Sequence, residues 1–300
     1  MASLFEFQVS DVSTFRPSSG ILLTGAPLFW KKQITGKGII IGILDSGIDS
    51  SHPDLKNKII KQRDYVGDNI IKSKYHPHGT HVAGIIAANG KIKGVAPDAK
   101  IIDYRVLDVN GIGSFENISK AIIDATNDGC HIINLSLGAP FSSKGLDDAL
   151  KYALSKKILV VAAAGNDGKD HISYPAAFPG VLSVGAIEYN ITSSKITLPR
   201  NPWFSDSNKY VCVACDGWKV SSCTPNSSYK EMTGTSMASP HASGYAALIL
   251  SSGIKKEMLY NFMKSSTVDI LTPGRDDLSG NGLLTVYKQL PKYNDLVKSL

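Results

Sequence analysis

The chain has 300 residues, of which 43% are hydrophobic and 19% are charged, and its formal net charge is +6 at pH 7. This length and composition are typical of a globular protein with one large domain or two small ones. The positive charges are dispersed, and no apolar stretch reaches the roughly 18 residues that span a bilayer, so we expect neither nucleic-acid binding nor membrane insertion.

The first 20 residues are mostly polar and lack the basic start and apolar core of a secretory signal peptide. The four cysteines are too few for a disulfide scaffold, and the C-x2-C-x7-C spacing of Cys212, Cys215 and Cys223, with no nearby histidine, does not match a zinc site. We therefore expect reduced thiols in a cytoplasmic protein, with a Cys215–Cys223 disulfide as a regulatory alternative. An N-terminal extension over 1–20 would precede a single folded domain over 21–300.

Apolar runs alternate with helical patterns along most of the chain. Strands are expected at 39–44, 101–107, 131–137, 158–164 and 181–187, and helices at 80–88, 115–127, 145–156, 236–251 and 254–264. Continuous apolar runs are typical of strands that are buried on both faces of a parallel sheet. The alternation predicts an α/β fold, a doubly wound and mostly parallel sheet with helices on both faces in three layers, with its active site at the carboxyl ends of the strands.

The first strong strand runs into Asp45-Ser46-Gly47-Ile48-Asp49, which places a carboxylate at the carboxyl end of a strand, facing a crevice. Alone, this aspartate would be interpreted as a turn cap. The next helix is preceded by His78, in His78-Gly79-Thr80-His81-Val82-Ala83-Gly84. A lone histidine is more often structural than catalytic, and we expect that structural role for His81.

A third candidate is Ser236, in Gly234-Thr235-Ser236-Met237-Ala238-Ser239-Pro240, at the start of an apolar helix. A serine at this position is ordinarily a helix cap. A serine used as a nucleophile needs a base and a group that orients the base, and a helix N-terminus favours developing negative charge.

Asp, His and Ser follow one another in the order of the subtilisin triad, each at an element boundary. The three motifs together resemble those of the subtilisin-like serine proteases, the subtilases, and the resemblance covers about residues 21–290. It implies that Ser236 attacks the peptide carbonyl, that His78 takes and returns the proton, and that Asp45 orients the imidazole. It also implies that Asn166, after the strand at 158–164, donates a hydrogen bond to the oxyanion.

The resemblance further implies that a peptide substrate binds as an added strand between two backbone segments. These segments are Gly111, Ile112 and Gly113 on one side, and Ser136, Leu137 and Gly138 on the other. The S1 pocket would be walled by Ala163, Ala164 and Gly165, with Asp167 and Ser173 near its far end and Phe115 lining S4. Small walls imply a roomy S1 pocket for large apolar side chains, and Asp167 could tolerate a basic one.

Within the family, the chain is most similar to the intracellular subtilisins of bacteria, in motifs such as Ser173-Tyr174-Pro175, whose Tyr-Pro step is cis in relatives. In that branch a short N-terminal extension lies across the active site until it is cut. Residues 4–8 could do so here, although they lack the proline-containing motif of that branch.

No cofactor is needed for this chemistry. Asp54 matches a calcium ligand of the family, but the segment 87–94 is short and carries two lysines, whereas Ca²⁺ requires several oxygen ligands. We therefore expect the usual loop site to be lost, and a weaker calcium site elsewhere stays open. The expected partner is a peptide or protein substrate, and a homodimer is left open.

The sequence thus predicts a serine endopeptidase of broad specificity with an apolar-leaning S1 pocket. Two alternatives are a maturation protease that cuts one leader peptide, and a catalytically inactive homologue that binds peptides. All four catalytic positions are intact, which argues against the second alternative.

Overall fold

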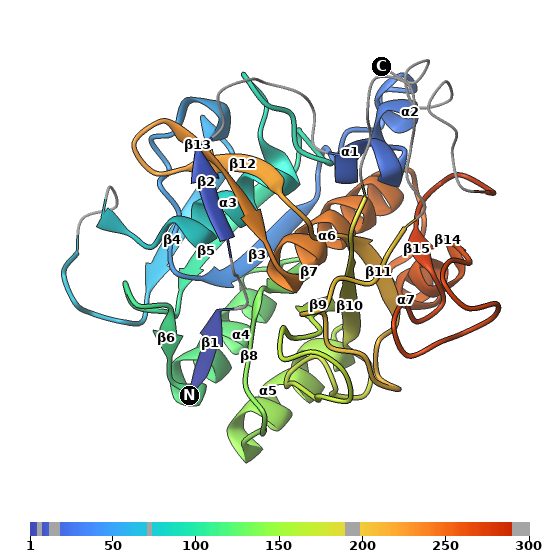
Figure 1. The fold of residues 1–300 in the computed structure, drawn as a ribbon. Coiled ribbons are helices and arrows are strands. Elements are labelled where there is room, and N and C mark those ends of the chain that lie inside the picture. Colours follow the sequence, from blue (N-terminus) through green and yellow to red (C-terminus); the bar gives the residue numbers. More distant parts are fainter. Residues whose placement is uncertain (5–7, 12–18, 71–73, 190–198, 290–300) are drawn as a thin grey trace.

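The computed structural model describes residues 1–4, 8–11, 19–70, 74–189 and 199–289, which fold around one large sheet (Figure 1). The strands of this sheet are β3 (Ile40–Asp45), β4 (Ile59–Asp64), β5 (Lys100–Arg105), β7 (Ile132–Leu135), β9 (Leu159–Ala163), β10 (Leu182–Ile187), β11 (Val213–Asp216), β14 (Thr267–Val268) and β15 (Leu283–Leu284). Their order is β14-β15-β11-β10-β9-β7-β3-β5-β4. All neighbours are parallel except β14 and β15.

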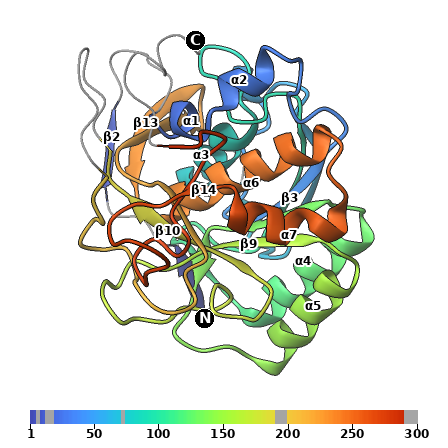
Figure 2. The same ribbon diagram turned by 90° about the vertical axis from the view of Figure 1, so that its right-hand side faces the viewer.

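Helices cover both faces of this sheet, which confirms the predicted fold class. The helices are α1 (Ser19–Thr24), α2 (Ala26–Trp30), α3 (Pro77–Ala87), α4 (Phe115–Asn127), α5 (Lys144–Ser155), α6 (Thr235–Ser251) and α7 (Lys256–Ser265), with a 3₁₀ turn at Pro53–Leu55. Side chains of α3, α6 and α7 belong to one buried cluster, and those of α4 and α5 to another. In Figure 2, α4 and α5 lie together below β9, and α6 lies above it.

Alternate residues of the central strands supply these two clusters. In β9, Leu159 and Val161 belong to the α6 side, whereas Val160 and Ala162 belong to the α4 and α5 side. Successive side chains of a strand point to opposite faces, so a strand that is buried on both faces must be apolar throughout. This is the physical reason for the continuous apolar runs in the sequence.

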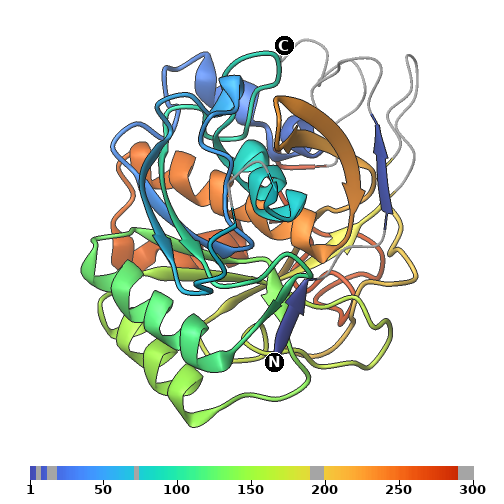
Figure 3. The same cartoon turned by 90° about the vertical axis from the view of Figure 1, so that its left-hand side faces the viewer.

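Two small antiparallel sheets flank the large one and include the N-terminal extension. In the first, β1 (Ala2–Leu4) lies between β6 (Ile112–Gly113) and β8 (Leu137–Gly138). In the second, β2 (Gln8–Asp11) pairs with β13 (Ser228–Thr233), which also pairs with β12 (Val220–Thr224). The strands β1 and β2 are the two dark-blue arrows in Figure 3.

Several details differ from or extend the sequence predictions. His78 is the second residue of α3 rather than the residue before it, because Pro77 begins the helix, where its missing N–H is not needed. The Tyr174–Pro175 bond is cis, as the resemblance implied, and all four cysteines are free thiols. Among the described residues, no helix is both long enough and apolar enough to cross a bilayer.

Candidate active site

A buried aspartate–histidine pair lies at the carboxyl end of β3. The Nδ1 atom of His78 lies 2.8 Å from Oδ1 and 3.0 Å from Oδ2 of Asp45, and both side chains are fully buried. The N–H of Ser46 also donates to Oδ1, at 2.7 Å. A carboxylate at Nδ1 favours the tautomer in which Nδ1 carries the proton, so Nε2 of His78 is left as the basic nitrogen.

Glycine allows this pair to form. A Cβ atom on Gly79 would lie 2.4 Å from the carbonyl oxygen of Gly47 and 3.1 Å from Oδ1 of Asp45. The sequence His78-Gly79 therefore lets the first turn of α3 pack directly on the loop that follows β3.

Ser236 is the second residue of α6 and is buried. Its hydroxyl donates to the backbone oxygen of Ser136 at 3.0 Å, and the Ser136 hydroxyl in turn bonds the backbone oxygen of Ser236 at 3.0 Å. A hydroxyl has one proton to donate, so in this conformation the Ser236 proton is held by Ser136 rather than by His78. These two bonds join the start of α6 to the end of β7.

The side chain of Asn166 is oriented by Thr235. Its Oδ1 atom accepts from the Thr235 N–H at 3.0 Å and from the Thr235 hydroxyl at 2.8 Å. The Nδ2 atom is buried and has no hydrogen-bond partner within the described ranges. It therefore remains a free donor beside the N-terminus of α6, whose first N–H groups have no partner within the helix.

The two predicted substrate-binding segments lie on either side of β1. Ser3 lies opposite both Ile112 of β6 and Gly138 of β8, Ala2 lies opposite Gly113, and Leu4 lies opposite Leu137. The predicted peptide position is thus filled by Ala2–Leu4. Of the residues 4–8 expected there, only Leu4 lies in β1, and residues 5–7 lie outside the described residues.

The side chain of Ala2 is part of a buried apolar cluster. Ala2 is 1% exposed and belongs to a cluster with Leu107, Leu137 and, at its edge, Phe115. On the other side of the site, Gln8 of β2 lies opposite Thr233, three residues before Ser236. The N-terminal extension therefore contacts strands on both sides of the candidate nucleophile.

Three of the residues predicted for the S1 pocket, Gly165, Asp167 and Ser173, contact the carboxyl-bearing residue Asp206, which the sequence did not indicate. Oδ1 of Asp206 accepts from the N–H groups of Asp167 and Gly168 at 2.6 and 2.9 Å, and its Oδ2 accepts from the Ser173 hydroxyl at 3.4 Å. Burial raises the pKa of Asp206 to about 6. Ala163, Ala164 and Gly165 are buried and Asp167 is exposed.

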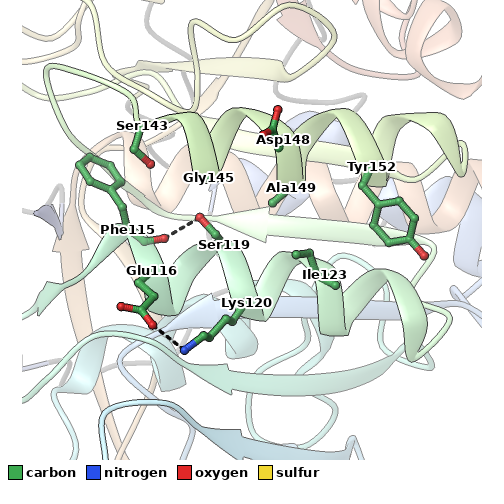
Figure 4. A pocket seen from close by; sticks show the side chains of 10 residues that line it. All are labelled: Phe115, Glu116, Ser119, Lys120, Ile123, Ser143, Gly145, Asp148, Ala149 and Tyr152. Atoms are coloured by element: carbon green, nitrogen blue, oxygen red, sulfur yellow. Dashed lines mark hydrogen bonds and ion pairs between the residues drawn. The ribbon is translucent and has the colours of Figure 1, made fainter.

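A groove of about 730 Å³ lies apart from these residues, between α4 and α5 (Figure 4). Phe115 lies at one end, where its ring packs edge to face against Phe141 with the ring centroids 5.4 Å apart. Neither Asp45, His78 nor Ser236 lines the groove, so it is not the candidate catalytic cleft.

The surroundings of Asp54 do not fit a calcium ion. Its Oδ1 and Oδ2 atoms accept from the N–H groups of Lys91 and Ile92, at 2.9 and 2.7 Å. Calcium requires six to eight oxygen ligands, whereas here N–H donors point at the carboxylate. No group of three or more His, Cys, Asp or Glu side chains in the described part of the chain could hold a metal ion.

Comparisons with known proteins show which family the chain resembles. The Peptidase_S8 pattern, described as the subtilase family, matches residues 36–285. The major intracellular serine protease of Bacillus subtilis (strain 168) is 41% identical over 257 residues, covering 81% of this chain and 77% of the relative. The intracellular serine protease of Paenibacillus polymyxa is 36% identical, covering 92% and 88%. Subtilisin Savinase of Lederbergia lenta is 36% identical, covering 88% and 95%.

Proposed function

The chain belongs to the subtilase family and is a serine protease, and from this we propose that it is an endopeptidase that acts through Asp45, His78 and Ser236. The observation that carries the proposal is the buried hydrogen bond between Asp45 and Nδ1 of His78, at 2.8 Å. Such a pair holds the imidazole in one tautomer and stabilises its charged form, which a general base beside a serine requires.

In the proposed reaction, the Ser236 hydroxyl turns from the Ser136 carbonyl to Nε2 of His78, loses its proton to that nitrogen and attacks the peptide carbonyl. The oxyanion accepts hydrogen bonds from Nδ2 of Asn166 and from the backbone N–H of Ser236. His78 then gives its proton to the leaving amine, and an acyl-enzyme remains on Ser236. Water then hydrolyses this ester. His78 takes a proton from the attacking water and gives it to the Ser236 oxygen as the acyl group leaves.

We propose that the substrate takes the place of β1 and pairs with β6 and β8. Backbone pairing gives affinity with little dependence on sequence, which favours broad specificity with an apolar-leaning S1 pocket along Ala163 and Ala164. Residues 1–18 would then act as an internal inhibitor, because β1 occupies the same backbone donors and acceptors. The reaction needs no cofactor, and the names of the two intracellular relatives favour an intracellular location.

Cleavage assays test the catalytic proposal. The full chain is incubated with casein and with a panel of tetrapeptide anilides, with and without a serine-directed inhibitor, beside the Ser236→Ala variant. We expect inhibitor-sensitive cleavage of casein and of several anilides, and none by the variant. Cleavage of a narrow set alone would favour a leader-peptide protease. No cleavage by either the full chain or the chain that begins at Ser19 would favour a peptide-binding homologue.

A truncated chain that begins at Ser19 tests the inhibitory role of the extension. Ser19 and Gly20 are kept because the Ser19 hydroxyl bonds the buried carboxylate of Asp216 and Gly20 packs against the His241 ring. We expect a higher initial rate than that of the full chain, and inhibition when a peptide of residues 1–18 is added back. An unchanged initial rate would contradict this role.

A further inference from the structure

The carboxylate of Asp206 lies directly behind the Gly165 wall of the proposed S1 pocket. A Cβ atom on Gly165 would lie 2.0 Å from Oδ2 of Asp206 and 2.8 Å from the Ser173 hydroxyl, so only glycine allows this approach. The backbone agrees, since Gly165 has a φ of +120°. The backbone N–H of Asp206 also donates to the Gly165 oxygen at 2.9 Å, which fixes the two segments against each other.

The Asp206 carboxylate is not paired with a lysine or an arginine among the described residues. Across the described ranges, no Lys or Arg nitrogen lies within 4.0 Å of it, and the nearby charges are those of Asp167 and the His171 ring. Its side chain is fully buried, and its two N–H bonds both go to Oδ1. A buried carboxylate without a counter-charge is unfavourable, so a cation delivered to this place would be stabilised.

Ser173 links the carboxylate to the pocket. Because its hydroxyl donates its one proton to Oδ2 of Asp206, the Ser173 oxygen can only accept hydrogen bonds from other groups. The far end of S1 therefore offers an acceptor with a negative charge behind it. This combination suits an ammonium or guanidinium group, since a hydrogen bond with an ionised donor is roughly twice as strong as a neutral one.

We propose that Asp206, acting through Ser173, makes Lys and Arg favoured P1 residues of this protease, in addition to the large apolar ones. The inference rests on the proposed endopeptidase function. It assigns to the chain a substrate class, peptides with a basic residue on the acyl side of the cleaved bond. Asp206 is a specificity-determining residue and takes no part in bond cleavage.

The experiment compares tetrapeptide anilides that differ only at P1, which is Arg, Lys, Phe or citrulline, the uncharged isostere of Arg. For the full chain we expect kcat/KM for Arg to exceed that for citrulline by about tenfold or more. Asp206→Asn can keep both bonds to Oδ1 and loses only the charge and the Oδ2 acceptor. We expect this variant and Ser173→Ala to lose about tenfold on Arg and Lys, with a change of less than about threefold on Phe.

Asp54→Asn is the matched control, because Asp54 is also a buried residue whose carboxylate accepts two backbone N–H groups. For this variant, the ratio of kcat/KM on the Arg substrate to that on the Phe substrate should equal the wild-type ratio. Equal cleavage of the Arg and citrulline substrates by the wild type would overturn the inference without any variant. An equal loss on Arg and Phe in Asp206→Asn would also overturn it, since that is the signature of a purely structural role. Cleavage after Phe but never after Arg or Lys would remove this inference and leave the endopeptidase proposal standing. No cleavage of any anilide, either by the full chain or by the chain that begins at Ser19, would overturn both.

Discussion

Asn166 illustrates how one neighbour decides what a side chain can do. A side-chain amide has an acceptor end and a donor end, and Thr235 engages the acceptor end with two hydrogen bonds. The donor end is left buried without a partner in the described structure. A buried unsatisfied donor costs about 1–3 kcal/mol, so its retention is best explained by a partner that forms only during the reaction.

Replacing Asn166 by Ala should therefore affect the reaction more than substrate binding. We expect kcat to fall by about 10²–10³-fold while KM changes by less than about threefold, as for removal of one oxyanion donor. Steady-state kinetics on a P1-Phe anilide measures both constants. A kcat within threefold of the wild type would argue against a role for this amide in stabilising the oxyanion.

At the level of single residues, the sequence predicted those candidate site residues that lie in recognisable motifs. Asp45, His78, Ser236 and Asn166 follow elements in an order that points to one chemistry, although their roles remain predictions. Asp206 has no such signal, because it lies in a loop about 40 positions after Gly165, and its importance arises only from close packing on that glycine. Thr235 lies inside the serine motif, but its hydrogen bond to Asn166 joins segments that are far apart in the sequence and could not be predicted from it.

The loop after α3 is held in place by the carboxylate of Asp54. Asp54 accepts the N–H groups of Lys91 and Ile92, so it ties the loop to the 3₁₀ turn at Pro53–Leu55. Asp54→Ala should leave both N–H groups without their acceptor and lower the free energy of unfolding by roughly 2–4 kcal/mol.

This loss should be the same in excess calcium and in EGTA. Thermal and denaturant unfolding of Asp54→Ala, measured in the inactive Ser236→Ala background to prevent self-digestion, would check it. A destabilisation present only in calcium would mean that Asp54 binds the ion after all.

The strand β1 can be tested without deleting the extension. Ser3 is paired on both sides, and a proline there removes its N–H and interrupts the ladder. We expect Ser3→Pro to raise the initial rate of the full chain about threefold or more, and Ser3→Ala, which keeps the backbone donor, to behave as the wild type. Equal rates for both variants would show that pairing of β1 does not limit activity.

Among the elements, the long buried strands and helices could be predicted, whereas the short paired strands could not. A two-residue strand such as Ile112–Gly113 has no periodicity and is defined only by its partner. The hairpin of β12 and β13 is likewise half polar in sequence, and the pairing of β2 with β13 joins segments more than 200 positions apart. The resemblance to a family placed the substrate segments where local patterns gave no information.

At the scale of the whole molecule, burial opposes the charging of two kinds of group. Burial lowers the pKa of His81 to about 3 and that of His241 to about 4, and it raises the pKa values of Asp206 and Asp216 to about 6. Below pH 6.5 these two histidines bind protons in the unfolded chain but stay neutral in the folded chain. Their contribution to the free energy of unfolding therefore falls as the pH drops, towards pH 4 for His241 and pH 3 for His81. Each aspartate acts in the opposite sense, because the folded chain takes up its proton near pH 6 and the unfolded chain only near pH 3.8.

The two effects oppose each other between pH 6 and pH 4, and single variants should separate them. Asp216→Asn removes a carboxyl group whose protonation stabilises the folded chain as the pH falls. The free energy of unfolding of this variant should therefore fall more steeply with decreasing pH than that of the parent, by up to about 1.4 kcal/mol per pH unit. His241→Gln removes a histidine whose contribution to stability is lost as the pH falls. The free energy of unfolding of this variant should therefore fall less steeply with decreasing pH than that of the parent, by a similar slope. Urea titrations of both variants in the Ser236→Ala background, at half-unit steps over this range, measure the slopes. Profiles parallel to that of the parent would mean that these two side chains titrate alike in the folded and unfolded chains, and that the acid response of the fold originates in other groups.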